Sequence, residues 1–99
     1  MKKTVSILVI TLNELPQLRR LVASLRAQDY RDYDLTICDN NSSDDTAAYA
    51  RSIGAAYVNT GRNAGTAAFN YGLQKAGGKY IFFIATDMLI TKGCIRRLV

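Results

Sequence analysis

The chain has 99 residues, of which 48% are apolar and 21% are charged, and its formal net charge is +5. These values are typical of one small globular domain and exclude an intrinsically disordered chain. The longest apolar run lies between Lys79 and Asp87, far short of the ~18 residues that a membrane-spanning helix needs. The basic charge suits an anionic ligand or an anionic membrane surface, and a solvated surface explains it equally.

The chain begins with Lys2 and Lys3, but the apolar run that follows is too short to predict a signal peptide. Cys38 and Cys94 lack a CxxC spacing, which favours free thiols in a reducing compartment. We therefore expect a cytoplasmic location, with the inner face of the membrane as the alternative. Histidine is absent, which excludes a His-ligated metal site and a histidine general base.

The first third of the chain predicts a strand, a helix and a second strand. Residues Thr4 to Ile10 are β-branched and almost continuously apolar, as in a strand covered on both faces. Pro16 suits a first helical turn. Apolar residues then recur at helical spacing, at Leu18, Leu21, Val22 and Leu25. After a polar turn, Leu35 to Cys38 predicts a second strand.

The segment DNNSSDDTAAYA predicts the start of a second helix. Ser42 or Ser43 is expected to cap it, with Asp44 and Asp45 in its first turn. Gly54 is expected to end it, and Ala56 to Asn59 reads as a third strand.

The last third predicts a helix over Thr66 to Ala76, a fourth strand over Tyr80 to Ile84 and a further helix from Thr91. The inward face of the Thr66 helix is expected to carry Ala67, Ala68, Tyr71 and Leu73. Alternating strands and helices predict an α/β fold with three layers, in which helices flank a mostly parallel, Rossmann-like sheet of about four strands.

Polar side chains follow all four predicted strands at the point where each strand ends. In parallel sheets, ligands bind at this carboxyl-terminal edge. The segments that meet there are Thr11-Leu12-Asn13-Glu14, Asp39-Asn40-Asn41, Gly61-Arg62-Asn63 and Ala85-Thr86-Asp87. This convergence is the strongest indication of a binding site that the residues themselves provide.

Two acids at this edge suggest specific chemistry. Asp39 can accept hydrogen bonds from a ribose or a base N–H, and Asp87 can ligate a hard divalent cation such as Mg²⁺ or Mn²⁺. Each has a structural alternative: Asp39 as the cap of a turn, and Asp87 as the cap of the last helix. Asn13 and Glu14 are equally consistent with a helix-entry motif, and Arg62 and Asn63 with a solvent-facing loop. The first loop contains neither GxGxxG nor GxxxxGK[ST], which argues against a dinucleotide or P-loop site.

Taken together, the segments VSILVITLNELPQLRRLVASLRAQDY, DLTICDNNSSDDT and GRNAGTAAFNYGLQKAGGKYIFFIATD resemble family 2 glycosyltransferases, which have the GT-A fold. The resemblance implies that residues 1–99 are the donor-binding half of such a domain, with the acceptor half following Val99. It implies transfer of a sugar from a nucleotide-diphosphate sugar to a growing polysaccharide or a lipid-linked glycan. It implies no nucleic-acid partner.

The resemblance also implies roles for individual residues. Thr11, Leu12, Asn13 and Glu14 would line the base pocket, Asp39 would contact the base, and Asn63 would lie in the donor site. Asp87 would bind a divalent cation and the diphosphate as the second acid of a DXD motif. The chain departs from the family pattern at Leu12, where an aromatic residue is common, at Phe69, where an arginine is common, and at Ala85, the first acid of DXD. No residue can be assigned as the catalytic base.

Two other functions are consistent with the sequence. A non-catalytic module could act by binding a partner or by self-association through an open sheet edge and an apolar face. A nucleotidyltransferase-like domain would share the architecture, but it should carry a glycine-rich, lysine-bearing loop after the first strand, and this chain has none.

Overall fold

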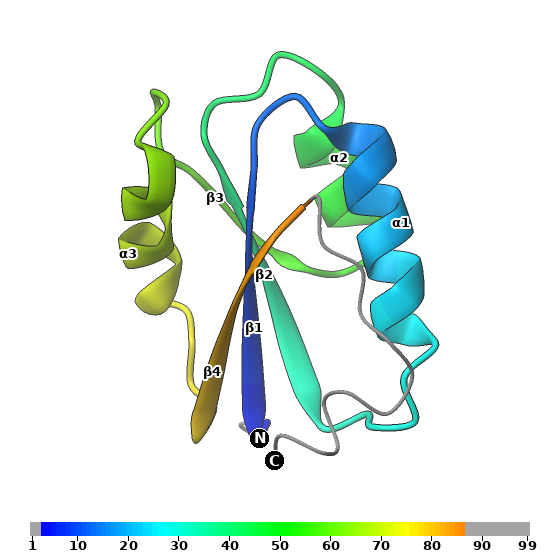
Figure 1. Ribbon diagram of the computed structural model, residues 1–99. Helices are drawn as coiled ribbons and strands as arrows, with labels where there is room; N and C mark the ends of the chain where they lie inside the picture. Colours follow the sequence, from blue (N-terminus) through cyan, green and yellow to red (C-terminus); the bar gives the residue numbers. More distant parts are fainter. Residues whose placement is uncertain (1–2, 87–99) are drawn as a thin grey trace.

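The computed structural model describes residues 3–86 and consists of four parallel strands flanked by helices (Figure 1). Along the chain the elements are β1 (Val5–Thr11), α1 (Leu15–Arg26), β2 (Tyr33–Asp39), α2 (Thr46–Ser52), β3 (Ala56–Asn59), the 3₁₀ turn η1 (Gly65–Ala67), α3 (Ala68–Leu73) and β4 (Tyr80–Ala85). The sheet order is β3-β2-β1-β4. The predicted α/β class and parallel sheet are therefore confirmed.

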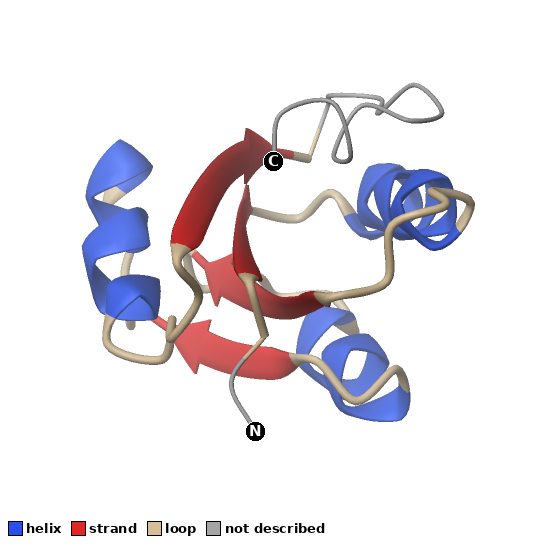
Figure 2. Cartoon of the chain, turned by 90° about the horizontal axis from the view of Figure 1, so that it is seen from below, coloured by secondary structure: helices blue, strands red, loops and turns tan. Residues whose placement is uncertain are grey.

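The helices cover both faces of the sheet, as Figure 2 shows in a view from below. Helices α1 and α2 lie on one face, where the larger apolar core forms around alternate residues of β1 and the buried stripe of α1. This core includes Val5, Ile7, Val9, Leu18, Leu21, Val22, Leu25 and Ile37. Helix α3 lies on the other face over Leu8 and Cys38. Strand β1 is central because it pairs along its length with both β2 and β4.

The strands match the prediction closely, and β3 matches it at both ends. Strand β2 begins two residues before the predicted Leu35, because Tyr33 and Asp34 pair with Val5 and Ser6 of β1. The buried α1 stripe and the stop at Gly54, which has a positive φ of 73°, are confirmed.

The predicted start of α2 is wrong. The helix begins at Thr46, so Asp44 and Asp45 precede its first turn. Neither serine caps it, because the Ser42 hydroxyl donates to Asp39 and the Ser43 hydroxyl to Asn13. Asp44 instead accepts hydrogen bonds from the backbone N–H and the hydroxyl of Thr46.

The inward face predicted for the third helix is also wrong for three of its residues. Ala68 is buried as expected, but Ala67, Tyr71 and Leu73 are exposed. The second buried position is Gly72, one helical turn after Ala68. Helix α3 lies so close to the sheet that only small residues have room on its inner face. A Cβ at Gly72 would meet Cys38 Sγ at 2.4 Å.

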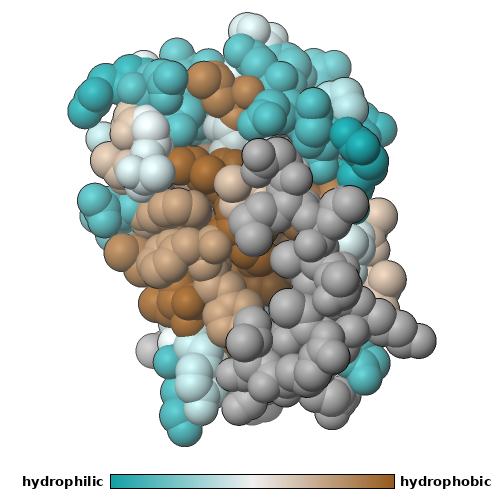
Figure 3. Space-filling model, in the orientation of Figure 1, coloured by the Kyte–Doolittle hydropathy of each residue, from teal (hydrophilic) through white to brown (hydrophobic). Residues whose placement is uncertain are grey.

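Strand β4 shows an apolar face that the described residues leave open. Ile81 is 37% exposed and Phe83 is 51% exposed, on the face of the sheet that carries α3. The ring of Phe83 packs edge-on against Phe69, with centroids 4.8 Å apart. Figure 3 shows the apolar surface that results over β4 and the adjoining side of α3. We call Ile81, Phe83 and Phe69 the β4 patch.

No helix within residues 3–86 has the length and the apolar character that a membrane crossing requires. The predicted helix from Thr91 lies outside the described residues.

Candidate functional site

The candidate site lies at the carboxyl-terminal edge of the sheet, where hydrogen bonds join the β1–α1 and β2–α2 loops. Asn13 lies between β1 and α1 with a left-handed backbone, φ 51°, a conformation that asparagine tolerates better than most residues. Its backbone N–H donates to Ser42 Oγ (2.8 Å). Its side-chain Oδ1 accepts from Ser43 N (2.8 Å) and Ser43 Oγ (3.1 Å). Asn13 therefore fixes these two loops to each other.

Asn40, directly after β2, joins the same edge to the loop before α3. The side chain is buried, and its Nδ2 donates to the carbonyl oxygen of Gly65 (3.1 Å). Its Oδ1 accepts from the Ala64 N–H (2.9 Å) and the Thr60 hydroxyl (3.3 Å). A buried amide that is satisfied on both sides sets the position of a loop that has little other structure.

The end of β4 is attached to the first loop through Thr86. This buried hydroxyl donates to Glu14 Oε1 at 2.7 Å and lies 3.3 Å from the carbonyl oxygen of Ile10. This hydrogen bond holds the Glu14 carboxylate beside Thr86, which directly precedes Asp87 in the chain.

These contacts surround a cavity of about 290 Å³. Its lining comes from the ends of β1 and β4, the first loop and the η1 turn: Ile10, Thr11, Leu12, Glu14, Asn40, Gly65, Thr66, Ala85 and Thr86. Three of the predicted site residues, Thr11, Leu12 and Glu14, thus lie together. The Thr11 hydroxyl is buried and has no hydrogen-bond partner among the described residues.

Asp39 lies beneath this edge rather than at its surface, with 1% of the residue exposed. Its Oδ1 accepts from Ser42 N (2.9 Å) and Ser42 Oγ (2.6 Å), and its Oδ2 accepts from the Tyr57 hydroxyl (2.6 Å). Burial, and then the hydrogen bond to Asp39, raise the pKa of Tyr57 to about 12, so the phenol keeps its proton at neutral pH. In this conformation the carboxylate is satisfied by the protein itself.

The other predicted residues lie apart from the cavity. Asn63 is exposed in the loop before η1, where its Oδ1 accepts from the Gly65 N–H (3.0 Å). Asn13 joins the loops without lining the cavity. Asp87, the predicted metal ligand, lies outside the described residues.

The cavity supplies few ligands of its own for a divalent cation. Residues 3–86 contain no group of three acidic, histidine or cysteine side chains that could hold a metal ion. Among residues 3–86, Glu14 is the one carboxylate that lines the cavity. Such a set suits a cation that takes one or two carboxylates and completes its shell with phosphate oxygens and water.

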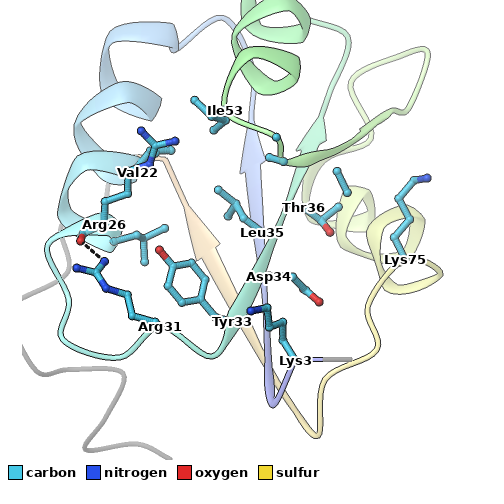
Figure 4. A pocket seen from close by; sticks show the side chains of 14 residues that line it. Lys3, Val22, Arg26, Arg31, Tyr33, Asp34, Leu35, Thr36, Ile53 and Lys75 are labelled. Carbon is cyan, nitrogen blue, oxygen red and sulfur yellow. Dashed lines mark hydrogen bonds between the residues drawn. The ribbon is translucent and has the colours of Figure 1, made fainter. Parts of the chain in front are cut away.

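A second cavity, of about 550 Å³, lies at the opposite edge of the sheet (Figure 4). Apolar residues of α1 and β2 line it together with Lys3, Arg26, Arg31 and Lys75. The Arg31 guanidinium donates to the carbonyl oxygen of Arg26 (2.5 Å) and so stabilises the end of α1. None of the predicted site residues within 3–86 lines this cavity.

Sequence reasoning missed two residues of the site. Tyr57 sits in the middle of β3 and reads as a packing residue, and only the parallel pairing of β2 with β3 brings it near Asp39. Thr86 follows the fourth strand in the sequence, and nothing in the local pattern indicates a role for it. Its burial and its hydrogen bond to Glu14 are properties of the fold.

The sequence profile of the family described as "Glycosyl transferase family 2" matches residues 6–99. The chain therefore belongs to glycosyltransferase family 2.

Curated relatives agree with this assignment. The chain is 27% identical over 100 residues to the GalNAc(5)-diNAcBac-PP-undecaprenol β-1,3-glucosyltransferase of Campylobacter jejuni, covering 94% of this chain and 32% of the relative. It is 36% identical over 85 residues to an uncharacterized glycosyltransferase of Mycobacterium tuberculosis, covering 82% of this chain and 32% of the relative. The chain thus spans about a third of the length of these relatives.

Solved structures show the same fold, the GT-A type. TarS of S. aureus, solved also with UDP-GlcNAc, has a TM-score of 0.86 at 24% identity, and the match to TarS 1-349 covers 99% of this chain and 31% of that one. The mannosyltransferase PcManGT of Pyrobaculum calidifontis, solved with GDP-Man and Mn²⁺, has a TM-score of 0.79 at 24% identity, covering 90% of this chain and 29% of that one.

Proposed function

We propose that residues 1–99 form the donor-binding half of a glycosyltransferase domain and bind a nucleotide-diphosphate sugar at the carboxyl-terminal edge of the sheet. One observation carries the proposal: three loops and the end of β4 are tied together around a single cavity at this edge. The solved structures of similar fold that contain UDP-GlcNAc or GDP-Man support this class of ligand.

In this proposal each predicted residue has a role that follows from its position. Leu12 supplies apolar surface beside the base, and Glu14 accepts hydrogen bonds from donor hydroxyls within the cavity. Asn13 and Asn63 hold the loops that form the pocket, and Asp39 recognises the base.

Asp87 and a divalent cation complete the proposal. The Mn²⁺ in the PcManGT structure supports a metal, and the proposed ligand is Asp87 with the donor's diphosphate. Such a cation, when bound, neutralises the charge that develops on the departing diphosphate. The hydrogen bond between Glu14 and Thr86 would orient the segment that carries Asp87, because Thr86 directly precedes Asp87.

In the whole protein we propose transfer of the sugar to a glycan or a lipid-linked acceptor. The name of the Campylobacter jejuni relative, which acts on an undecaprenol-linked glycan, supports the lipid-linked class. The general base that activates the acceptor hydroxyl is not assigned to any residue of this chain.

Isothermal titration of the protein that carries this chain tests the donor site. We expect UDP or GDP to release binding heat, with tighter binding when Mn²⁺ is present. Replacing Glu14 with Gln should weaken binding roughly ten- to a hundredfold, since a hydrogen bond to a charged group is worth roughly 1.5–3 kcal/mol. Asp45→Asn, an exposed acid away from the cavity, is the matched control. An absence of binding by every nucleoside diphosphate at millimolar concentration would overturn the proposal.

The exposed β4 patch supports a second candidate, a non-catalytic module that associates through this surface. Ile81 and Phe83 are more exposed than large apolar residues usually are in a small monomer. Self-association of the chain and nucleotide binding are separate measurements, so the two candidates can be distinguished.

A further inference from the structure

The carboxylate of Asp39 belongs to a chain of hydrogen bonds that continues into β3. Gly61 N–H donates to Asn59 Oδ1 (2.7 Å), so the amide nitrogen of Asn59 faces the other way. That nitrogen donates to the Tyr57 hydroxyl (3.2 Å). Because the Asn59 amide nitrogen can only donate and the carboxylate can only accept, the Tyr57 proton is directed to Asp39 Oδ2 (2.6 Å). The Tyr57 hydroxyl thus donates to an acid and accepts from an amide.

The parallel register explains why these groups meet. Asp39 pairs with Asn59, and Ile37 pairs with Tyr57, so Asp39, Tyr57 and Asn59 all project from the same face of neighbouring strands. On the other side, Asp39 pairs with Thr11, whose buried hydroxyl lacks a partner among the described residues. Thr11 also lines the candidate donor cavity, so the group is joined to that cavity through one strand pairing.

The hydrogen-bonding pattern of Tyr57 has a counterpart in the nucleotide bases. Uracil carries a donor, N3–H, next to an acceptor, O4, and guanine carries N1–H next to O6. Either edge could donate to Asp39 and accept from Asn59, as the Tyr57 hydroxyl does. Cytosine and adenine carry an acceptor nitrogen where uracil and guanine carry the ring N–H, so at the same position on Asp39 their ring nitrogen would direct a lone pair at the carboxylate.

We propose that the Tyr57 hydroxyl occupies the base-recognition position of the free protein, and that the donor's base displaces it from Asp39. The inference rests on the proposed function. It explains how a carboxylate that is 1% exposed can still read a base. Tyr57 is then a specificity-determining residue: it keeps the buried charge satisfied until a base with the donor–acceptor order of uracil or guanine replaces it.

If the donor's base displaces the Tyr57 hydroxyl, removing that hydroxyl should have an effect that a purely structural role of Tyr57 would not produce. In Tyr57→Phe the free protein loses one donor to a buried carboxylate and becomes less stable, while a bound base no longer competes with the phenol. Stability and affinity should therefore change in opposite directions. If Tyr57 merely supported the pocket, both would fall.

The test measures UDP, GDP and CDP binding by titration calorimetry, and unfolding by urea, for the wild-type protein, Tyr57→Phe and the control Tyr49→Phe. The Tyr49 ring lies on α2, and its hydroxyl is outside the hydrogen-bond chain described above. We expect Tyr57→Phe to bind its preferred nucleoside diphosphate about three- to tenfold more tightly, the equivalent of one net hydrogen bond, with a lower urea midpoint. Tyr49→Phe should leave affinity unchanged.

A modified base provides the second measurement. If the preferred nucleotide is UDP, its N3-methyl derivative cannot donate to Asp39 and should gain nothing from Tyr57→Phe; for GDP the N1-methyl derivative serves. Equal or weaker binding of the parent nucleotide by Tyr57→Phe, or an equal gain for the methylated base, would overturn the inference while leaving the donor site intact. Failure of all nucleoside diphosphates to bind any variant would overturn the proposed function and this inference with it.

Discussion

Cys38 shows how burial controls the chemistry of a single residue. The thiol lies between Leu8 and Gly72 beneath α3, and desolvation raises its pKa to about 11. Since the thiolate is the reactive form, the native thiol should be inert near neutral pH.

We predict that Cys38 reacts with a disulfide reagent only after unfolding. In a Cys94→Ser background, the native protein at about pH 8 should react far more slowly than the urea-unfolded protein.

The raised pKa of Cys38 also makes the stability of the protein depend on pH. The unfolded thiol ionises near its ordinary value of 9.0 and the folded thiol near 11, so the free energy of unfolding should fall as pH rises through this range. Cys38→Ala should lose that part of the pH dependence; fast native labelling would contradict the prediction.

Asp39 is predicted to contribute to stability whether or not a ligand binds. In Asp39→Asn, the amide keeps one acceptor oxygen and places an NH₂ group against donors from Ser42 or Tyr57. A lost buried hydrogen bond of this kind costs about 1–3 kcal/mol. Urea unfolding should show this loss in the free energy of unfolding, with Asp45→Asn close to the wild type. Equal stability of the two variants would mean that the hydrogen bonds to Asp39 contribute little.

At the scale of elements, the position of α3 depends on small residues at the contact with the sheet. Ala68 and Gly72 face Leu8 and Cys38, and the larger Tyr71 and Leu73 point outward. The close approach places η1 and its glycine near Asn40, where the cavity forms.

Gly72→Ala should therefore destabilise the protein and disturb the cavity. The new methyl group would lie 2.4 Å from Cys38 Sγ and 3.2 Å from Leu8 Cδ2, so α3 or the strands must shift. Overpacking of this kind costs about 1–3 kcal/mol. Asn70→Ala, on the exposed face of the same helix, is the control, and it should retain wild-type stability in thermal unfolding followed by circular dichroism. A more stable Gly72→Ala, as helix propensity alone predicts, would show that the contact is looser than described.

At the scale of the whole molecule, the β4 patch gathers apolar side chains at one edge of the sheet. In the described part of the chain, β4 has one strand neighbour, β1, and the exposed ring of Phe83 packs against the partly buried ring of Phe69 on the α3 side. A free strand edge beside apolar surface favours association.

We predict that the chain self-associates through this patch and that Phe83→Ser reduces the association. Sedimentation velocity over a range of concentrations measures the effect, and circular dichroism checks that the fold persists. Lys75→Ser, an exposed residue outside the patch, is the control for a surface substitution to serine. A wild-type chain that stays monomeric at the highest concentration would contradict the prediction.

Most of the fold could be predicted because hydrophobic patterns repeat with the period of each element. β-Branched runs located the strands, and the helical spacing of Leu18, Leu21, Val22 and Leu25 gave the buried stripe of α1. The errors came where a group outside the helix competes for a residue that the local pattern assigns to that helix. Asp39 takes the Ser42 hydroxyl that would otherwise have capped α2, and the close approach of α3 reverses the expected preference for large residues inside.

The sequence by itself determined the parallel α/β architecture, the family and the edge of the sheet at which polar segments gather, because strand period, loop order and motif spacing are properties of the chain alone. Only the tertiary structure decided which groups at that edge touch. The pairing of β2 with β3 places a phenol from the middle of one strand against the acid that ends the other. The pairing of β1 with β4 brings Thr86 to Glu14, seventy-two residues apart. Such contacts depend on register between distant segments, and no local pattern records that register.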